Sequence, residues 1–176
     1  MLRKIVSGGQ TGVDRAALDA AIALGIAHGG WCPRGRLAED GRIRRRYRLK
    51  ETPSAIYAQR TEWNLRDSGG TLIINRGPLD GGTRYTAQLA ARYRKPLLIL
   101  QLERRIDPLR VRAWLRRDRV RTLNVAGPRE SKRPGICRES RPVLLRLFAR
   151  INSGSEPEFG EGAWNASSAS TRSTSC

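Results

Sequence analysis

The sequence contains few of the residues that hold transition metals. Among its 176 residues there are one histidine, His28, and three cysteines, Cys32, Cys137 and Cys176. The cysteines are far apart, and no Cys-x-x-Cys pair is present. A structural zinc site needs about four cysteine or histidine ligands at close spacing. The sequence therefore argues against a zinc site, and we expect no metal ligands.

Long hydrophobic runs are also missing. No apolar stretch approaches the roughly 20 residues that a helix needs to span a bilayer. Residues 1–8 contain no extended apolar core of the kind that a secretory signal peptide carries. The simplest interpretation is a cytoplasmic protein that does not contact a membrane.

Acidic residues are scarce, with 16 Asp and Glu against 34 Lys and Arg, which gives a net charge of +18. Such an excess attracts polyanions and anionic small molecules. The arginines are scattered along the whole chain, which fits a base composition that favours arginine codons equally well. Trp31, Tyr47 and Tyr57 lie near the basic segment 34–50, but aromatic residues are few for stacking on bases. Nucleic-acid binding stays an alternative, which a lack of steeply salt-dependent DNA affinity would exclude.

Apolar residues gather in short segments that alternate between strand and helix spacing. The predicted strands are 5–6, a short one ending at Pro33, 71–74, 97–100 and 122–126, and the predicted helices start at 13, 55, 83, 107 and 136. Ser54 and Thr83 are predicted N-caps, and the polar residues 34–53 are predicted to form a long loop. The fully apolar segments 71–74 and 97–100 are typical of the middle of a parallel sheet.

This alternation predicts one domain over residues 1–151, with a Rossmann-like three-layer α/β/α fold around a central parallel sheet. The last predicted helix covers about residues 136–151. From Asn152 onward Ser, Gly, Glu and Ala dominate, so residues 152–176 are predicted to be a disordered low-complexity tail.

Glycine-rich loops follow several of these strands. Because parallel strands point their carboxyl ends at one edge, we expect the loops 7–12, 32–35, 77–83 and 127–135 to meet there. In the first loop, three glycines would let backbone N–H groups approach an anion beside the positive end of the following helix. The spacing is neither Gly-x-Gly-x-x-Gly nor a P-loop with its lysine, so NAD and Mg-ATP chemistry lack support.

A second glycine turn, Gly81-Gly82-Thr83, repeats this arrangement, with Thr86 one helical turn further on. Two such helix N-termini side by side can hold two anionic groups or one diphosphate. Arg34, Arg36 and Arg60 can supply guanidinium groups to a phosphate. The predicted ligand contacts are Gly8, Gly9, Gln10, Thr11, Gly12, Asp14, Arg34, Arg60, Gly81, Gly82, Thr83, Thr86 and Ser131. No catalytic triad or carboxylate pair can be assembled, so no catalytic residue is assigned and a binding protein is favoured over an enzyme.

With these loops in place, the chain resembles the molybdenum cofactor carrier family, a Rossmann-like group related to the LOG-type and lysine-decarboxylase-like proteins. The resemblance rests on residues 7–19, 30–41, 60–64, 81–83 and 123–131. It implies a bacterial carrier that binds the molybdenum cofactor (molybdopterin), a phosphorylated pterin dithiolene, without chemistry. Molybdoenzymes would be the acceptors, and related folds suggest a homo-oligomer. The features that such a carrier needs are anion-binding loops and donors for the pterin edge.

Two alternatives within the same fold remain. LOG-type relatives cleave nucleoside monophosphates and resemble this chain through the motif Gly-Gly-x-Gly-Thr-x-x-Glu. Here Thr86 stands where that motif has its catalytic glutamate. Without the carboxylate, stabilisation of an oxocarbenium-like transition state loses its main source, which disfavours a phosphoribohydrolase. A nucleotide-binding sensor without catalysis is the other alternative.

Overall fold

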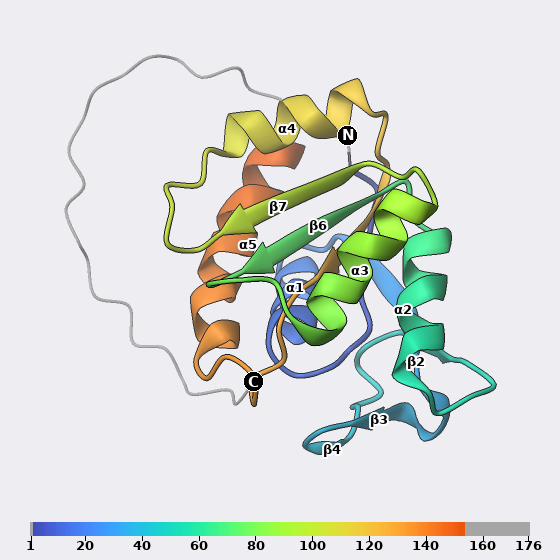
Figure 1. Cartoon of the computed structure of the whole chain (residues 1–176). Helices are drawn as coiled ribbons and strands as arrows, with labels where there is room; N and C mark the ends of the chain where they lie inside the picture. The colour runs from blue at the N-terminus through green and yellow to red at the C-terminus, as the bar shows by residue number, and fades with distance from the viewer. Residues whose placement is uncertain (1, 154–176) are drawn as a thin grey trace.

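A six-stranded parallel sheet forms the centre of the molecule (Figure 1), which we analysed as a computed structural model that describes residues 2–153. The strands are β1 (Lys4–Val6), β2 (Ala27–Cys32), β5 (Leu49–Glu51), β6 (Gly70–Asn75), β7 (Leu97–Gln101) and β8 (Thr122–Ala126). Their order is β5-β2-β1-β8-β6-β7, and each neighbouring pair is parallel. The strand order reverses beside β1, so a crevice forms at the carboxyl ends of β1, β8 and β6.

Five helices cover the two faces of the sheet. They are α1 (Val13–Ala23), α2 (Tyr57–Arg66), α3 (Gly81–Arg92), α4 (Pro108–Arg117) and α5 (Ile136–Asn152). α5 packs against both α1 and α4 on one face, whereas α2 and α3 pack together on the other, with α3 in front of β6 and β7 in Figure 1. The predicted Rossmann-like three-layer fold is confirmed.

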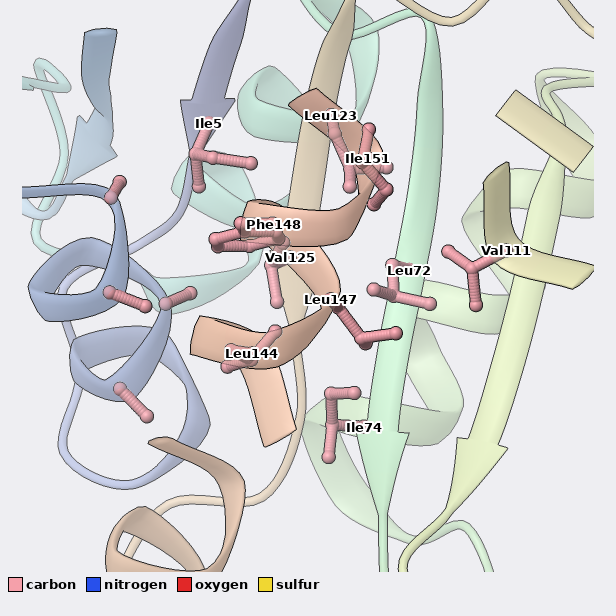
Figure 2. Packing of buried hydrophobic residues seen from close by; sticks show 14 of the residues in the cluster. Ile5, Leu72, Ile74, Val111, Leu123, Val125, Leu144, Leu147, Phe148 and Ile151 are labelled. Carbon is pink, nitrogen blue, oxygen red and sulfur yellow. The ribbon is translucent and has the colours of Figure 1, made fainter. Parts of the chain in front are cut away.

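The main core lies between the sheet and α5. Figure 2 shows Leu144, Leu147 and Phe148 of α5 directed at the strands that carry Ile5, Leu72, Leu123 and Val125. These side chains recur three or four residues apart on α5, which places them on one face of the helix. The small residues Ala16, Ala17, Ala20 and Ala21 let α1 approach this layer closely. This packing holds the loops at the carboxyl edge in fixed positions.

One prediction about the sheet was wrong. The apolar residues of β7 were expected in the middle of the sheet, but β7 is the edge strand and hydrogen-bonds to β6 alone among the strands of residues 2–153. Its side chains are only partly buried, and Ile99 is 37% exposed. A continuous apolar run reports high hydrophobicity, but it does not report how many neighbours a strand has.

Residues 34–53 form more structure than the predicted loop. A 3₁₀ turn (Arg34–Arg36) leads into a short antiparallel hairpin of β3 (Leu37–Ala38) and β4 (Gly41–Arg42). The chain then returns as β5, which extends the sheet beyond β2. Ile43, Tyr47 and Leu49 build a second small core with Leu18 and Cys32. Because these apolar residues are separated by arginines, the segment shows no clear periodicity in the sequence.

Two predicted helix caps were also wrong. Asp80 precedes α3, so Thr83 is its third residue instead of its cap. Ile56 takes the cap position of α2, while the Ser54 hydroxyl accepts a hydrogen bond from the Ile56 N–H at 3.0 Å. α5 extends to Asn152, and the rest of the predicted tail after Ser153 lies outside the described residues. Within residues 2–153, no helix is long and apolar enough to cross a membrane.

Candidate functional site

A pocket of about 370 Å³ opens at the carboxyl ends of β1, β6 and β8, beside the first turns of α2 and α3. Seven of the predicted contact residues line it, namely Gln10, Asp14, Arg60, Gly81, Gly82, Thr83 and Thr86. The remaining lining residues are Tyr57, Ala58, Thr61, Asp80, Tyr85, Ala126, Gly127, Pro128, Arg129 and Lys132. Three of the four loops expected to meet at this edge therefore contribute, and the loop 32–35 does not.

The second glycine turn lines the pocket with the N-terminus of α3. The preceding Asp80 side chain makes no capping hydrogen bond to the helix. The first N–H groups of a helix have no acceptor within it, and they carry partial positive charge. A Cβ added at Gly81 or Gly82 would meet no atom within 4 Å, so the space beside these N–H groups is open. This end of the pocket is shaped and charged to receive an anion.

Arg60 of α2 lies across the floor of the pocket and pairs with Asp14 of α1. Its Nη1 donates to Asp14 Oδ2 at 3.1 Å, and the side chain is 15% exposed. Asp14 is 3% exposed and also accepts the Gln10 N–H at 3.2 Å. Burial raises the pKa of Asp14, and Arg60 and these hydrogen bonds offset only part of that effect. The buried Nε of Arg60 has no hydrogen-bond partner among the described residues.

Gly8 makes this ion pair possible. A Cβ at Gly8 would overlap the Arg60 guanidinium and lie 2.8 Å from Asp14 Oδ2. The glycine thus makes room for a side chain of the protein instead of for a ligand. Gly9 has a similar role, because its φ is +74° and a Cβ there would overlap Leu49. Neither glycine lines the pocket.

The donors of the first turn are engaged by the protein's own groups. Gln10 Oε1 accepts from the Thr11 N–H at 3.0 Å and the Glu39 N–H at 2.9 Å. The Thr11 hydroxyl donates to the Glu39 carboxylate, and Asp14 takes the Gln10 N–H. The Gln10 and Thr11 N–H groups and the Thr11 hydroxyl therefore bind oxygens of the protein's own Asp14, Gln10 and Glu39 side chains.

The N-terminus of α1 is closed by a neighbouring loop. Gly12 has φ +77°, and the Val13 N–H donates to the Pro128 carbonyl at 3.2 Å. A Cβ at Gly12 would overlap that carbonyl. Both helix N-termini expected in the site reach the pocket, α1 through the Asp14 side chain and α3 through its first residues, but the Val13 N–H at the start of α1 is taken by the Pro128 carbonyl.

Glu39 joins three segments beside the pocket. It accepts from the Thr11 hydroxyl, from the hydroxyl and N–H of Ser131, and lies 3.4 Å from Arg129 Nε. Burial alone would raise the pKa of Glu39, but the hydrogen bonds from Ser131 and Thr11, with Arg129, outweigh it and lower the pKa below its ordinary value. Ser131, predicted as a ligand contact, is thus placed on Glu39 and does not line the pocket.

Replacing Glu39 with glutamine is expected to lower the free energy of unfolding by about 1–2 kcal/mol at pH 7. Because the folded-state pKa of Glu39 is lowered, its charge stabilises the fold above the unfolded pKa, and this contribution is lost as the pH falls through the folded value. The difference from the native protein should therefore shrink at about pH 3, measured by urea unfolding. Glu62→Gln, whose carboxylate accepts from Tyr93 at the surface, is the control and should change little. Equal losses at both pH values would assign the effect to packing instead.

Of the three arginines predicted to contact a phosphate, only Arg60 lines the pocket. Arg34 is exposed and lies in the loop that does not contribute. Arg36 is buried, and its guanidinium donates to the backbone carbonyls of residues 43, 44, 47 and 49 at 2.9–3.0 Å. It holds the segment 34–53 together, so it is unavailable to a phosphate.

Sequence reasoning missed Tyr57, Tyr85 and Lys132 as lining residues. Both tyrosine rings are partly exposed, at 41% and 36% respectively. The argument that selected Arg60, namely that the start of α2 faces the ligand edge, would also have selected Tyr57. Tyr85 follows the glycine turn of α3, and Lys132 lies in the predicted loop 127–135, so position relative to the strand ends was the available signal.

The fold and this pocket fall within the region that matches a known protein family. The match to the circularly permutated YpsA SLOG family covers residues 5–148, which include the whole sheet except Lys4 and every residue lining the pocket. The chain belongs to this family. The relationship to LOG-type proteins inferred from the sequence is therefore confirmed.

A solved structure of a relative gives the same result for the fold. The chain is 46% identical to a protein from Syntrophus aciditrophicus SB, described as a "putative molybdenum carrier protein", with a TM-score of 0.77. The alignment covers 84% of this chain and 94% of the relative. No protein with a curated description matches the chain.

Proposed function

We propose that this SLOG-family chain binds a phosphorylated heterocycle in the pocket and carries it without covalent chemistry, with the molybdenum cofactor as the ligand. The observation that carries the proposal is the open N-terminus of α3, which lines one pocket together with the Arg60 side chain. The name of the relative from Syntrophus aciditrophicus supports a molybdenum carrier. By analogy with related folds, we further propose a cytoplasmic homo-oligomer that delivers its ligand to molybdoenzymes.

The anionic part of the ligand fits the end of the pocket near Gly81 and Gly82. Backbone N–H groups of α3 would donate to phosphate oxygens, and the Lys132 ammonium would add a positive charge from the opposite loop. Arg60 is partly neutralised by Asp14, so it contributes hydrogen bonds more than net charge. This combination suits moderate affinity, which a carrier needs to release its ligand.

The heterocyclic part fits the side of the pocket that carries Tyr57 and Tyr85. Their rings offer flat apolar surfaces for a pterin or a purine. The carboxylate of Asp80 is available at the rim to accept from ring N–H groups, although it also pairs with Arg133 at 3.0 Å. A volume of about 370 Å³ lies within the usual range of small-molecule sites.

The pocket favours binding over hydrolysis. Thr86, at the position of the catalytic glutamate in LOG-type enzymes, donates its hydroxyl to the Gly82 carbonyl at 2.8 Å and is 3% exposed. The Thr86 hydroxyl is therefore hydrogen-bonded within α3, and this position presents no carboxylate to a ligand. A bound nucleotide would share the same phosphate and ring contacts, so the identity of the heterocycle is what the experiment must separate.

The test is Gly82→Asp, examined beside Gly82→Asn. Gly82 has an ordinary helical backbone and open space for a side chain. An aspartate in the first turn should keep or raise stability, because it complements the helix dipole. The same carboxylate should weaken anion binding about a hundredfold, since like charges would lie a few ångströms apart. Gly9 is unsuitable for this test, because a side chain there would strain the fold.

The affinity of each variant for inorganic pyrophosphate is measured by calorimetric titration. The natural ligand is identified by native mass spectrometry of protein purified from cells that make the molybdenum cofactor. We expect Gly82→Asn to keep the ligand and Gly82→Asp to lose it while unfolding at no lower temperature. The mass of the ligand separates a pterin from a nucleotide. A ligand retained by a folded Gly82→Asp variant would overturn the site assignment.

A further inference from the structure

A second groove, of about 310 Å³, lies at the opposite end of the molecule from the pocket lined by Gly81 and Gly82. The last described residues, Asn152 and Ser153, line this second groove. Its apolar floor consists of Leu2, Leu115, Val120 and Ile151. Its rim carries Arg112, Arg116, Arg119 and Arg121, and Asn152 and Ser153 at the end of α5 complete it. We call this the α4 groove. Ser153, the last described residue, therefore lies in the wall of this groove.

The rim of the α4 groove concentrates positive charge. Arg116, Arg119 and Arg121 are exposed, and none forms an ion pair within residues 2–153. Arg119 has φ +52°, in the left-handed region that glycine usually occupies after a helix. Neighbouring cations repel each other, so this rim favours a partner that carries several negative charges.

The described carboxylates are not available to fill that role. Of the 16 acidic residues, three lie in the segment 156–161 and all others lie in residues 2–153. Each of the latter accepts a hydrogen bond or pairs with a cation there, namely Asp14, Asp19, Glu39, Asp40, Glu51, Glu62, Asp67, Asp80, Glu103, Asp107, Asp118, Glu130 and Glu139. The other three acidic residues of the sequence are Glu156, Glu158 and Glu161.

We propose that residues 154–164 of the same chain dock on the α4 groove, with these three glutamates pairing with Arg116, Arg119 and Arg121. Glu156 is three residues beyond Ser153, so an extended chain carries it about 10 Å from the groove wall, within reach of the rim. No basic residue interrupts the segment before Arg172. The covalent connection raises the effective concentration of the segment at the groove without requiring strong individual ion pairs.

Docking of the acidic segment would reduce the non-specific binding of nucleic acid by this chain. A chain with a net charge of +18 attracts polyanions without regard to sequence. Three carboxylates held over the α4 groove would compete with nucleic acid for its arginines. The ligand pocket at the other end of the sheet would remain open.

The experiment measures chymotrypsin cleavage after Phe159 in the full chain, followed by mass spectrometry. One variant carries Glu156→Gln, Glu158→Gln and Glu161→Gln, and the other carries Arg116→Gln, Arg119→Gln and Arg121→Gln. We expect either variant to be cleaved about fivefold faster than the native chain, since proteolysis follows the population of the released segment. Combining the two sets should add little. In about 1 M salt the native rate should rise to that of the variants, because ion pairs are then screened.

The matched control is Arg92→Gln, Arg138→Gln and Arg141→Gln, which removes the same charge from exposed positions outside the groove. The groove variant leaves the cleaved sequence unchanged, so altered protease preference cannot explain its acceleration. Equal cleavage of the native and groove-variant chains would overturn the proposal, as would equal acceleration by the control. Protection that develops only when a DNA duplex is added would assign the groove to an external polyanion and overturn it as well.

Discussion

Replacing Arg60 with methionine is expected to lower the free energy of unfolding by about 3–5 kcal/mol at neutral pH. Arg60 pairs with Asp14, and both side chains are largely withdrawn from water. Methionine keeps much of the volume of the arginine stem, so the loss comes from leaving the Asp14 carboxylate without a counter-charge. The Gln10 N–H would remain as one of its hydrogen-bond donors, at 3.2 Å.

The pH dependence identifies the cause of this loss. The folded-state pKa of Asp14 is raised, and removing the Arg60 charge raises it further. A carboxyl group with a raised pKa stabilises the fold fully when it is protonated, and this stability is lost as the pH rises through the folded value. The deficit of Arg60→Met should therefore be small below about pH 4 and grow towards neutrality. Urea unfolding across this range, followed by tryptophan fluorescence, measures it.

A second substitution separates charge from packing. Asp14→Asn removes the buried carboxylate while keeping an acceptor for the Gln10 N–H, so Asp14→Asn with Arg60→Met should recover most of the lost stability. In the native background, Asp14→Asn should strengthen pyrophosphate binding, because Arg60 then keeps its full charge for the ligand. A deficit that is independent of pH, or that the double variant does not relieve, would show that the pair acts through packing.

Gly12→Ala is expected to cost at least about 3 kcal/mol of stability, because two penalties combine there. The backbone of Gly12 has φ +77°, which disfavours any L side chain. In addition, a Cβ would overlap the Pro128 carbonyl and approach the backbone of Arg129. That carbonyl accepts the Val13 N–H, so the loop after β8 cannot move away without breaking the hydrogen bond that closes α1.

Gly77→Ala is the matched control for this prediction. Gly77 has φ +75°, nearly the same as Gly12, but a Cβ there would meet no atom within 4 Å. Its replacement should cost only about 1–2 kcal/mol, the penalty for the left-handed backbone alone. Thermal unfolding of the two variants measures the difference. Equal losses of stability in the two variants would contradict this prediction. They would mean that the loop after β8 moves to accommodate the methyl group added at Gly12.

The local elements were accessible from the sequence because their signals are local. Helical spacing in residues 136–151 and the apolar run 122–126 predicted α5 and β8 almost to the residue. Gly81-Gly82-Thr83 predicted a helix N-terminus at the ligand edge, although the cap residue was placed three positions too late. Each of these inferences depends on residues within about one helical turn of each other.

The role of the first glycine turn depends on contacts that the sequence does not display. Whether Gly8, Gly9 and Gly12 leave space for a ligand is decided by Arg60, Leu49 and Pro128, which lie 40 to more than 110 residues away in the chain. The same spacing of glycines suits a phosphate loop and a loop filled by the protein's own carboxylates. Asp14 and Glu39 make the second arrangement.

The sequence by itself determined the alternation of strands and helices, the parallel sheet and the edge at which the glycine-rich loops meet, because these follow from periodicity and from the direction of the strands. The tertiary structure alone decided that β7 lies at the sheet edge, that Arg36 binds backbone carbonyls of the protein, and that the first N–H of α1 is taken by the Pro128 carbonyl while the space beside the start of α3 is open. The physical reason is that space and charge at a site are set by side chains from distant segments, which become neighbours only when the sheet assembles.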